Sequence, residues 1–137
     1  MSPVFEHIMQ DGGGLYSAVA LVTALLIGHV LADYPLQGEF LATGKNRHNA
    51  AHIPVPGKGD AKHVWVHCMT SHCLVHATFV WVVTGLALYA FIEFVLHFVI
   101  DYIKCEDMTT YTQDQLLHVA CKVVYVILIL NGVGVPG

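Results

Sequence analysis

Long apolar segments are the sequence feature that most constrains this fold. Residues 15–32 contain no Lys, Arg, Asp or Glu and approach the length needed to cross a bilayer. The chain is also almost continuously apolar from Lys62 to Ile103. A single helix of that length would measure about 60 Å, twice the hydrocarbon core of a membrane. We therefore expect a hairpin of two helices here, with its break near Thr84–Gly85.

Composition supports a membrane-embedded chain. Hydrophobic residues make up 55% of the sequence and charged residues only 12%, against about 25% for typical soluble domains. The sequence predicts an all-α integral membrane four-helix bundle forming a single domain over residues 1–137. The expected helices cover about 15–35, 62–84, 86–104 and 113–130. Four scattered cysteines give no sign of a disulfide framework.

The segments between these helices are polar. Residues 1–14 are expected to form an interfacial lead-in, and residues 36–61, with the turn-like stretch PVPGKG, a polar loop. Pro35 should terminate the first long helix. Thr110 or Thr112 is expected to cap the last one.

Each predicted helix carries two polar, metal-ligating side chains four residues apart, and therefore on one helix face. The pairs are His29 and Asp33, His72 and His76, His97 and Asp101, and Asp114 and His118. Burying them in an apolar helix is costly unless something pairs with them. Counting residues from the expected hairpin turn places all four pairs on the same side of the bilayer, so we expect them to meet.

The five histidines and three aspartates of these pairs are eight candidate metal ligands. Imidazole and carboxylate together suit zinc, manganese or iron, with zinc favoured. Eight ligands are too many for one tetrahedral ion and fit two divalent ions with room for water. For a single histidine, hydrogen bonding between helices is the competing interpretation. The coincidence of four pairs favours metal binding.

Other polar residues fall near this cluster. Glu93 and Lys122 each lie four residues deeper than a candidate ligand, and we expect them to pair beneath the site. A role for Glu93 as a general base is the alternative. Gln37 and Lys45 follow the first pair. A lysine and an arginine beside two metal ions suit an anionic group such as a phosphate, and ordinary loop charges are the alternative.

Basic residues predict the orientation. Those in or beside the loops on the side of the site are Lys45, Arg47, Lys58, Lys62 and Lys104. The positive-inside rule therefore predicts a cytoplasmic site, with both termini on the opposite side. The net charge of −4 and the lack of a basic patch argue against nucleic acid as a partner.

The motifs H-x3-D-Y-x-L-Q (from His29), H-x3-H (from His72), H-x3-D-Y-x-K (from His97) and D-Q-x2-H (from Asp114), with Lys45, resemble those of the domain of unknown function 3307 family. This resemblance covers about residues 25–120. It implies a compact multi-helix protein of bacteria and their phages, and thus a multi-pass protein of the bacterial inner membrane. A looser likeness to membrane-bound metal-dependent hydrolases favours phosphoester hydrolysis.

The leading functional hypothesis is a dinuclear metal-dependent hydrolase acting on a phosphoester or another lipid-type amphiphile at the cytoplasmic headgroup level. The candidate catalytic residues are Asp33, Asp101, Glu93, Lys45 and Gln37. A transporter of zinc or another divalent metal, and a non-catalytic, metal-stabilised membrane interaction protein, are the alternatives. The lipid bilayer is an expected partner, and a homo-oligomer is left open.

Overall fold

The computed structural model describes residues 1–10, 12, 14–50 and 63–136, and the regular structure in these ranges is helical, with no strand. The helices are α1 (Pro3–Met9), α2 (Leu15–Asp33), α3 (Gly38–Gly44), α4 (Arg47–Ala50), α5 (Val64–Thr84), α6 (Ala87–Cys105) and α7 (Tyr111–Leu130). The all-α prediction is confirmed for this part of the chain. The four long helices α2, α5, α6 and α7 correspond to the four expected ones, and their ends differ from the expected ends by a few residues.

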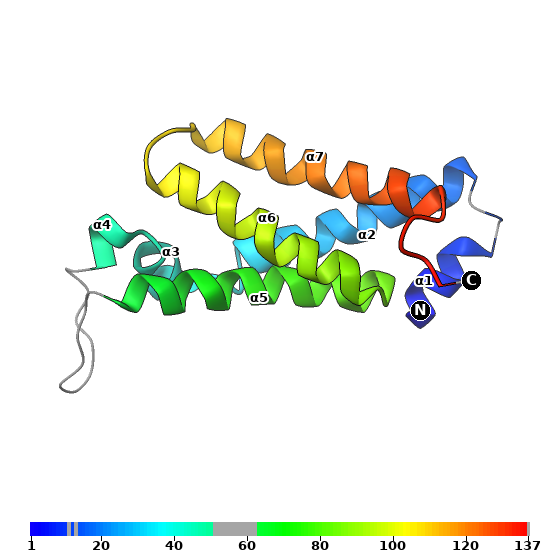
Figure 1. The fold of residues 1–137 in the computed structure, drawn as a ribbon, viewed down its shortest axis with the longest axis horizontal. Helices are drawn as coiled ribbons and strands as arrows, with labels where there is room; N and C mark the ends of the chain where they lie inside the picture. The colour runs from blue at the N-terminus through cyan, green and yellow to red at the C-terminus, as the bar shows by residue number, and fades with distance from the viewer. Residues whose placement is uncertain (11, 13, 51–62, 137) are drawn as a thin grey trace.

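The four long helices pack side by side around a shared interior. α5 and α6 form an antiparallel hairpin, α2 packs against α5 and α7, and α6 also packs against α7. Figure 1 shows both termini at one end of this bundle, with α3, α4 and the connection between α6 and α7 at the other. The loops expected on the side of the site therefore share one end of the molecule.

Local sequence signals explain where the long helices begin and end. α5 ends at Gly85, which adopts a left-handed conformation with φ of 72°, as glycine does readily. Thr110 caps α7 in a capping box with Gln113, in which each side chain binds the other residue's backbone N–H. The hairpin break and the Thr110 cap are both confirmed.

The expectation of a polar loop after the first long helix is wrong where α3 and α4 form. α3 packs against α5, and α4 is tied to the end of α6 by Arg47, which donates two hydrogen bonds to the Glu106 carboxylate at 2.7 and 2.6 Å. Such long-range contacts organise a segment whose own sequence carries no strong helical signal. The stretch PVPGKG and Lys58 and Lys62 lie outside the described residues.

Three helices are long and apolar enough to cross a membrane, namely α2, α5 and α7. α6 has a similar length but carries Glu93, Asp101 and Lys104, and it is not among the three. Large apolar side chains are exposed along the outer faces, including Ile27, Trp81, Phe91 and Val124. The molecule therefore has the helices and the surface of a multi-pass membrane protein in contact with lipid.

The interior of the bundle has two different halves. At the end near the termini, Leu21, Leu25, Val80 and Tyr89 belong to a continuous apolar core that also receives Phe5 of α1. The other half is polar, because five histidines and two aspartates of the long helices are buried there. All four cysteines are free thiols. The apolar core thus fixes the helices at one end and leaves the polar half as the candidate site.

Candidate metal centre

The structure brings together all eight side chains that the sequence nominated as ligands. They come from all four long helices, and seven of them are buried; Asp33 is the exception, with 11% of its side chain exposed. Their potential ligand atoms form three overlapping groups, within each of which the atoms lie within 4.8 Å of one another. The groups are Asp33, His72, His76 and His97; His29, His97 and His118; and Asp101, Asp114 and His118.

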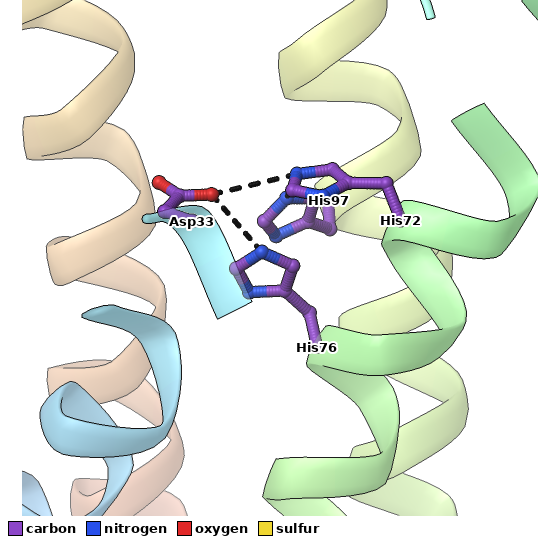
Figure 2. A group of neighbouring side chains, drawn as sticks. All are labelled: Asp33, His72, His76 and His97. Atoms are coloured by element: carbon purple, nitrogen blue, oxygen red, sulfur yellow. Dashed lines mark hydrogen bonds and ion pairs between the residues drawn. The ribbon is translucent and has the colours of Figure 1, made fainter. Parts of the chain in front are cut away.

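The first group, which we call the histidine half, surrounds Asp33 at the end of α2. Asp33 Oδ1 lies 3.1 Å from His76 Nε2 and 3.4 Å from His72 Nε2, and Figure 2 shows both contacts. His97 completes the group from α6, with its Nε2 atom 3.2 Å from that of His72. Three imidazoles and one carboxylate thus converge on one place, as in tetrahedral zinc sites.

The third group, which we call the aspartate half, lies between α6 and α7. His118 Nε2 lies 3.2 Å from Asp101 Oδ1 and 3.6 Å from Asp114 Oδ1. Asp101 also faces the histidine half, with its Oδ2 atom 3.3 Å from His72 Nε2. The two halves are therefore adjacent parts of one cluster.

His29 lies between the halves and is held by contacts from two helices. Its Nε2 atom is 3.3 Å from Asp33 Oδ2 and 3.4 Å from the side-chain oxygen of Gln115. Gln115 in turn donates to Asp33 Oδ2 at 3.0 Å and to Asp114 Oδ2 at 3.2 Å. Gln115 therefore joins the carboxylates of the two halves.

The spacing of these atoms fits a metal ion. Donors on one tetrahedral zinc ion, at bond lengths of about 2.0–2.2 Å, are separated by roughly 3.3–3.6 Å. The donor separations around Asp33 and His118 are 3.1–3.6 Å. In addition, His29 Nδ1, His76 Nδ1 and Asp114 Oδ1 are buried without a hydrogen-bond partner. Unpaired buried polar atoms are rare in native proteins, and here they indicate a cluster that can accept a ligand.

Beneath the cluster, the predicted pair of Glu93 and Lys122 is confirmed. Lys122 Nζ donates to Glu93 Oε1 at 2.6 Å, and the Tyr125 hydroxyl donates to Glu93 Oε2 at 3.0 Å. Glu93 Oε1 also lies 3.2 Å from His97 Nδ1, on the ring edge opposite the cluster. A carboxylate in this position fixes the orientation of a ligating histidine. Glu93 therefore contacts the site through His97.

A polar cavity of about 200 Å³ opens onto the cluster from the end of the bundle with α3. It is lined by Asp33, Tyr34, Gln37, Lys45, Asp101, Lys104, Tyr111, Asp114 and Gln115. Lys45 reaches in beside α3 and donates to Asp101 Oδ2 at 2.6 Å and to Gln37 Oε1 at 3.1 Å. The candidate catalytic residues Asp33, Asp101, Lys45 and Gln37 thus border this cavity, whereas Glu93 does not.

Sequence reasoning missed several residues of the site. Gln115 follows Asp114 directly, and an amide next to a ligating carboxylate was the available signal. Lys104 and Tyr34 belong to the motifs that carry the family resemblance but were given no role at the site. The Lys104 Nζ atom lies 3.4 Å from Asp114 Oδ2. Tyr111 had no signal in the sequence, and its hydroxyl forms a hydrogen bond with that of Tyr34 at the cavity.

Charged side chains at this end of the molecule are also paired outside the four long helices. The Arg47 guanidinium lowers the pKa of the Glu106 carboxyl by direct hydrogen bonding, and His48 Nε2 lies 3.2 Å from the same carboxylate. This exposed group fastens α4 to the start of the connection between α6 and α7. It therefore stabilises the entrance side of the bundle.

Fold and site together define an all-helical, multi-pass membrane protein with a buried histidine and aspartate cluster able to hold metal ions. The chain belongs to the family described as protein of unknown function (DUF3307), whose model matches residues 21–134. This confirms the family resemblance. No curated protein and no solved structure matches the chain, so the looser likeness to membrane-bound hydrolases has no support from these comparisons.

Proposed function

We propose that this protein is a dinuclear metal-dependent hydrolase that cleaves a phosphoester in a lipid-type amphiphile. The observation that carries this proposal is the polar cavity of about 200 Å³ that opens onto Asp33, Asp101 and Asp114. Structural metal sites are closed by their ligands, whereas catalytic sites keep an open position for water and substrate. A cluster of buried ligands with an open, polar side fits the catalytic class.

Seven of the eight side chains divide between two ions, and His29 lies between the two halves. The histidine half offers three imidazoles and one carboxylate, which suit zinc; the aspartate half offers two carboxylates and one imidazole, which also suit manganese or iron. When bound, such ions supply a water-derived nucleophile at neutral pH and polarise a phosphoryl oxygen.

The protein's own residues supply the remaining requirements. Lys45 and Lys104 line the cavity and present ammonium groups to a phosphate, and Gln37 holds the Lys45 ammonium through its side-chain oxygen. Glu93 keeps His97 in position from below. In this proposal Asp33 and Asp101 are ligands that face the substrate, and Glu93 is a positioning residue.

The position of the cavity favours an amphiphilic substrate at a membrane surface. It opens at the end of the bundle where α2 ends and α7 begins, which is the headgroup level if these helices cross the bilayer. α6 serves as a fourth span, since Glu93 and Asp101 are buried and paired while Phe91, Val95 and Val99 are exposed. Lys45, Arg47 and Lys104 at this end favour the cytoplasmic side of the bacterial inner membrane.

The apolar interior at one end of the bundle argues against the transporter alternative. In the described part of the chain, the region beyond Glu93 and Lys122 is filled by apolar side chains such as Leu21, Leu25 and Val80. An ion crossing the membrane needs a polar path, and buried charge without partners is costly there. A site open at one end alone suits a hydrolase better than a carrier.

The test uses the full chain purified in detergent. Elemental analysis measures bound metal, and phosphate release is followed from phosphatidic acid and from a polyprenyl phosphate, with and without a chelator. We expect about two equivalents of divalent metal and chelator-sensitive release. His76→Ala should abolish both. His67→Ala, an exposed histidine on the same helix, is the matched control and should retain both.

Metal-replete protein that leaves both substrates intact would overturn the hydrolase proposal. Purified protein that binds no divalent metal would overturn the metal centre as well. Metal-driven flux into sealed proteoliposomes, without hydrolysis, would favour the transporter instead.

A further inference from the structure

The two halves of the cluster differ in the cations that already neutralise them. Among the described residues, Asp33 forms ion pairs with histidines alone, namely His29, His72 and His76. Both carboxylates of the aspartate half, in contrast, are paired with lysines. Lys45 Nζ lies 2.6 Å from Asp101 Oδ2, and Lys104 Nζ lies 3.4 Å from Asp114 Oδ2. The chain's own ammonium groups thus occupy the aspartate half.

These lysines reach the aspartates from different elements of the fold. Lys45 follows α3, outside the four long helices, and its side chain is 8% exposed, whereas the Lys104 side chain on α6 is 29% exposed. Lys45 also lies 3.3 Å from His72 Nε2, at the boundary between the halves. The histidine half still retains Asp33, His76 and His97. One ion can therefore bind there without displacing a lysine from a carboxylate.

A second divalent ion in the aspartate half would meet two ammonium groups at close range. Repulsion between like charges is strong in a buried site, because the low local dielectric screens it poorly. The ion must also replace the lysines as partner of Asp101 and Asp114. A metal ion alone should therefore bind this half weakly.

A phosphate in the cavity would reduce the repulsion between the second ion and the two ammonium groups. Lys45, Lys104, Asp101 and Asp114 all line the same cavity, so an anion there can take over the ammonium groups as their partner. The carboxylates are then free to bind a cation. Asp114 Oδ1 is already buried without a hydrogen-bond partner, and His118 Nε2 lies 3.6 Å from it. The aspartate half thus holds one oxygen ready for a ligand.

We infer that the two ions bind in sequence: the first enters the histidine half alone, and the second enters the aspartate half together with a phosphate-type anion that draws Lys45 and Lys104 away. The inference rests on the proposed function, because it takes the cavity as the place where a phosphoester binds. In this scheme the second metal site is occupied only when Lys45 and Lys104 have left Asp101 and Asp114 for the phosphate of the substrate. The shared ligand chemistry is a phosphate group, free or on a lipid.

The experiment measures metal binding and needs no turnover. Calorimetric titration with micromolar zinc is performed on detergent-purified, chelator-treated protein, with and without inorganic phosphate, and then with a short-chain phosphatidic acid. We expect one tight equivalent without phosphate, and a second whose affinity rises about tenfold or more with it. By linkage, zinc must raise the affinity for phosphate by the same factor. Enhancement by the lipid alone would assign the effect to a lipid headgroup.

Variants test the lysines directly. Lys45→Met with Lys104→Met should bind two equivalents without phosphate and should lose the response to phosphate. Arg47→Met removes a cation that is paired with Glu106 outside the cavity, and should behave as the wild type. If the double variant does not fold, the reciprocal phosphate titration of the wild type still decides the matter.

Two equal zinc equivalents without any anion would overturn the inference, and so would a second site that neither phosphate nor the lipid strengthens. These outcomes leave the hydrolase proposal standing if phosphate release is observed. Sequential binding without any hydrolysis would instead support the inference and overturn the hydrolase proposal.

Discussion

Lys45 and Asp101 are separated by 56 residues in sequence, yet the Lys45 ammonium lies 2.6 Å from Asp101 Oδ2, and His72 Nε2 lies 3.3 Å from both atoms. The two residues belong to different elements, since Lys45 lies at the end of α3 and Asp101 lies on α6. The contact forms because α3 packs against α5, which brings Lys45 at the end of α3 to Asp101 of α6. This contact joins α3, which was not predicted from the sequence, to the cluster of histidines and aspartates, which was.

The first prediction concerns this buried pair in chelator-treated protein. Asp101→Asn leaves the buried Lys45 ammonium without its counter-charge and should lower the free energy of unfolding by about 3–5 kcal/mol. Lys45→Met should cost less, since Asp101 retains contacts with His72 and His118. Denaturant unfolding in detergent measures both. The double variant should be more stable than Asp101→Asn alone; equal stability of the two would contradict the pairing.

A second prediction concerns Glu93 as the residue that positions His97. Glu93→Gln weakens the contacts with His97 Nδ1 and Lys122 and should lower zinc affinity about 10- to 100-fold, although Glu93 lies outside the cavity. Competition with a chromogenic chelator measures the affinity. Glu39→Gln, at an exposed position of α3, is the matched control and should leave zinc affinity unchanged. Wild-type affinity in Glu93→Gln would rule out the positioning role.

Close packing of α2 on α5 gives a third prediction. A Cβ on Gly28, one residue before His29, would lie 2.9 Å from Phe79 Cβ, and neither atom can move without its backbone. Gly28→Ala should therefore push the two helices apart, reduce stability by about 1–3 kcal/mol and weaken metal binding. Thermal unfolding and zinc titration measure these effects. Gly14→Ala meets nothing within 4 Å and should change neither.

The turn between α5 and α6 gives a fourth prediction. Gly85 has a φ of 72°, and a Cβ there would overlap the backbone of Met1 and Ser2. Gly132 has a similar φ of 77° but lies in open space. Gly132→Ala should therefore cost only the strain of a left-handed residue, about 1–2 kcal/mol. Gly85→Ala should cost about 1–3 kcal/mol more, from the overlap. Equal unfolding midpoints would show that the chain's first residues do not pack there.

The fifth prediction is a pH dependence at the entrance side. The folded pKa of Glu106 is lowered by Arg47, so the pair's stabilisation is complete above the unfolded pKa of about 4.3 and is lost as pH falls through the lowered value. The protection of residues 38–50 against hydrogen exchange, relative to the intrinsic exchange rate at each pH, should fall in this acidic range. Glu106→Gln should show the faster exchange already at neutral pH, and should flatten its dependence on pH. Unchanged exchange in Glu106→Gln would mean that the pair does not hold α4.

Much of the candidate site could be predicted because its residues carry a local signal. His97 and Asp101 lie four residues apart in an apolar helix, and helical periodicity alone places them on one face. The same reasoning applied to Glu93 and Lys122 predicted a contact between two helices, because two buried charges at matched depth need each other. Lys104 and Gln115 stand in the family motifs but were not assigned to the site, because their place next to a ligand or at a helix end does not show that their side chains face the cavity.

The sequence by itself determined the four long helices, the hairpin break at Gly85 and the set of candidate ligands, because hydrophobic length, helical period and glycine conformation are properties of short segments. Only the tertiary structure decided that α3 returns to the cluster, that Lys45 and Lys104 occupy the aspartate half, and that one side of the cluster opens into a polar cavity. These features depend on contacts between residues far apart in the chain. They are stabilised by packing and charge pairing between distant residues, which cannot be deduced from the local sequence.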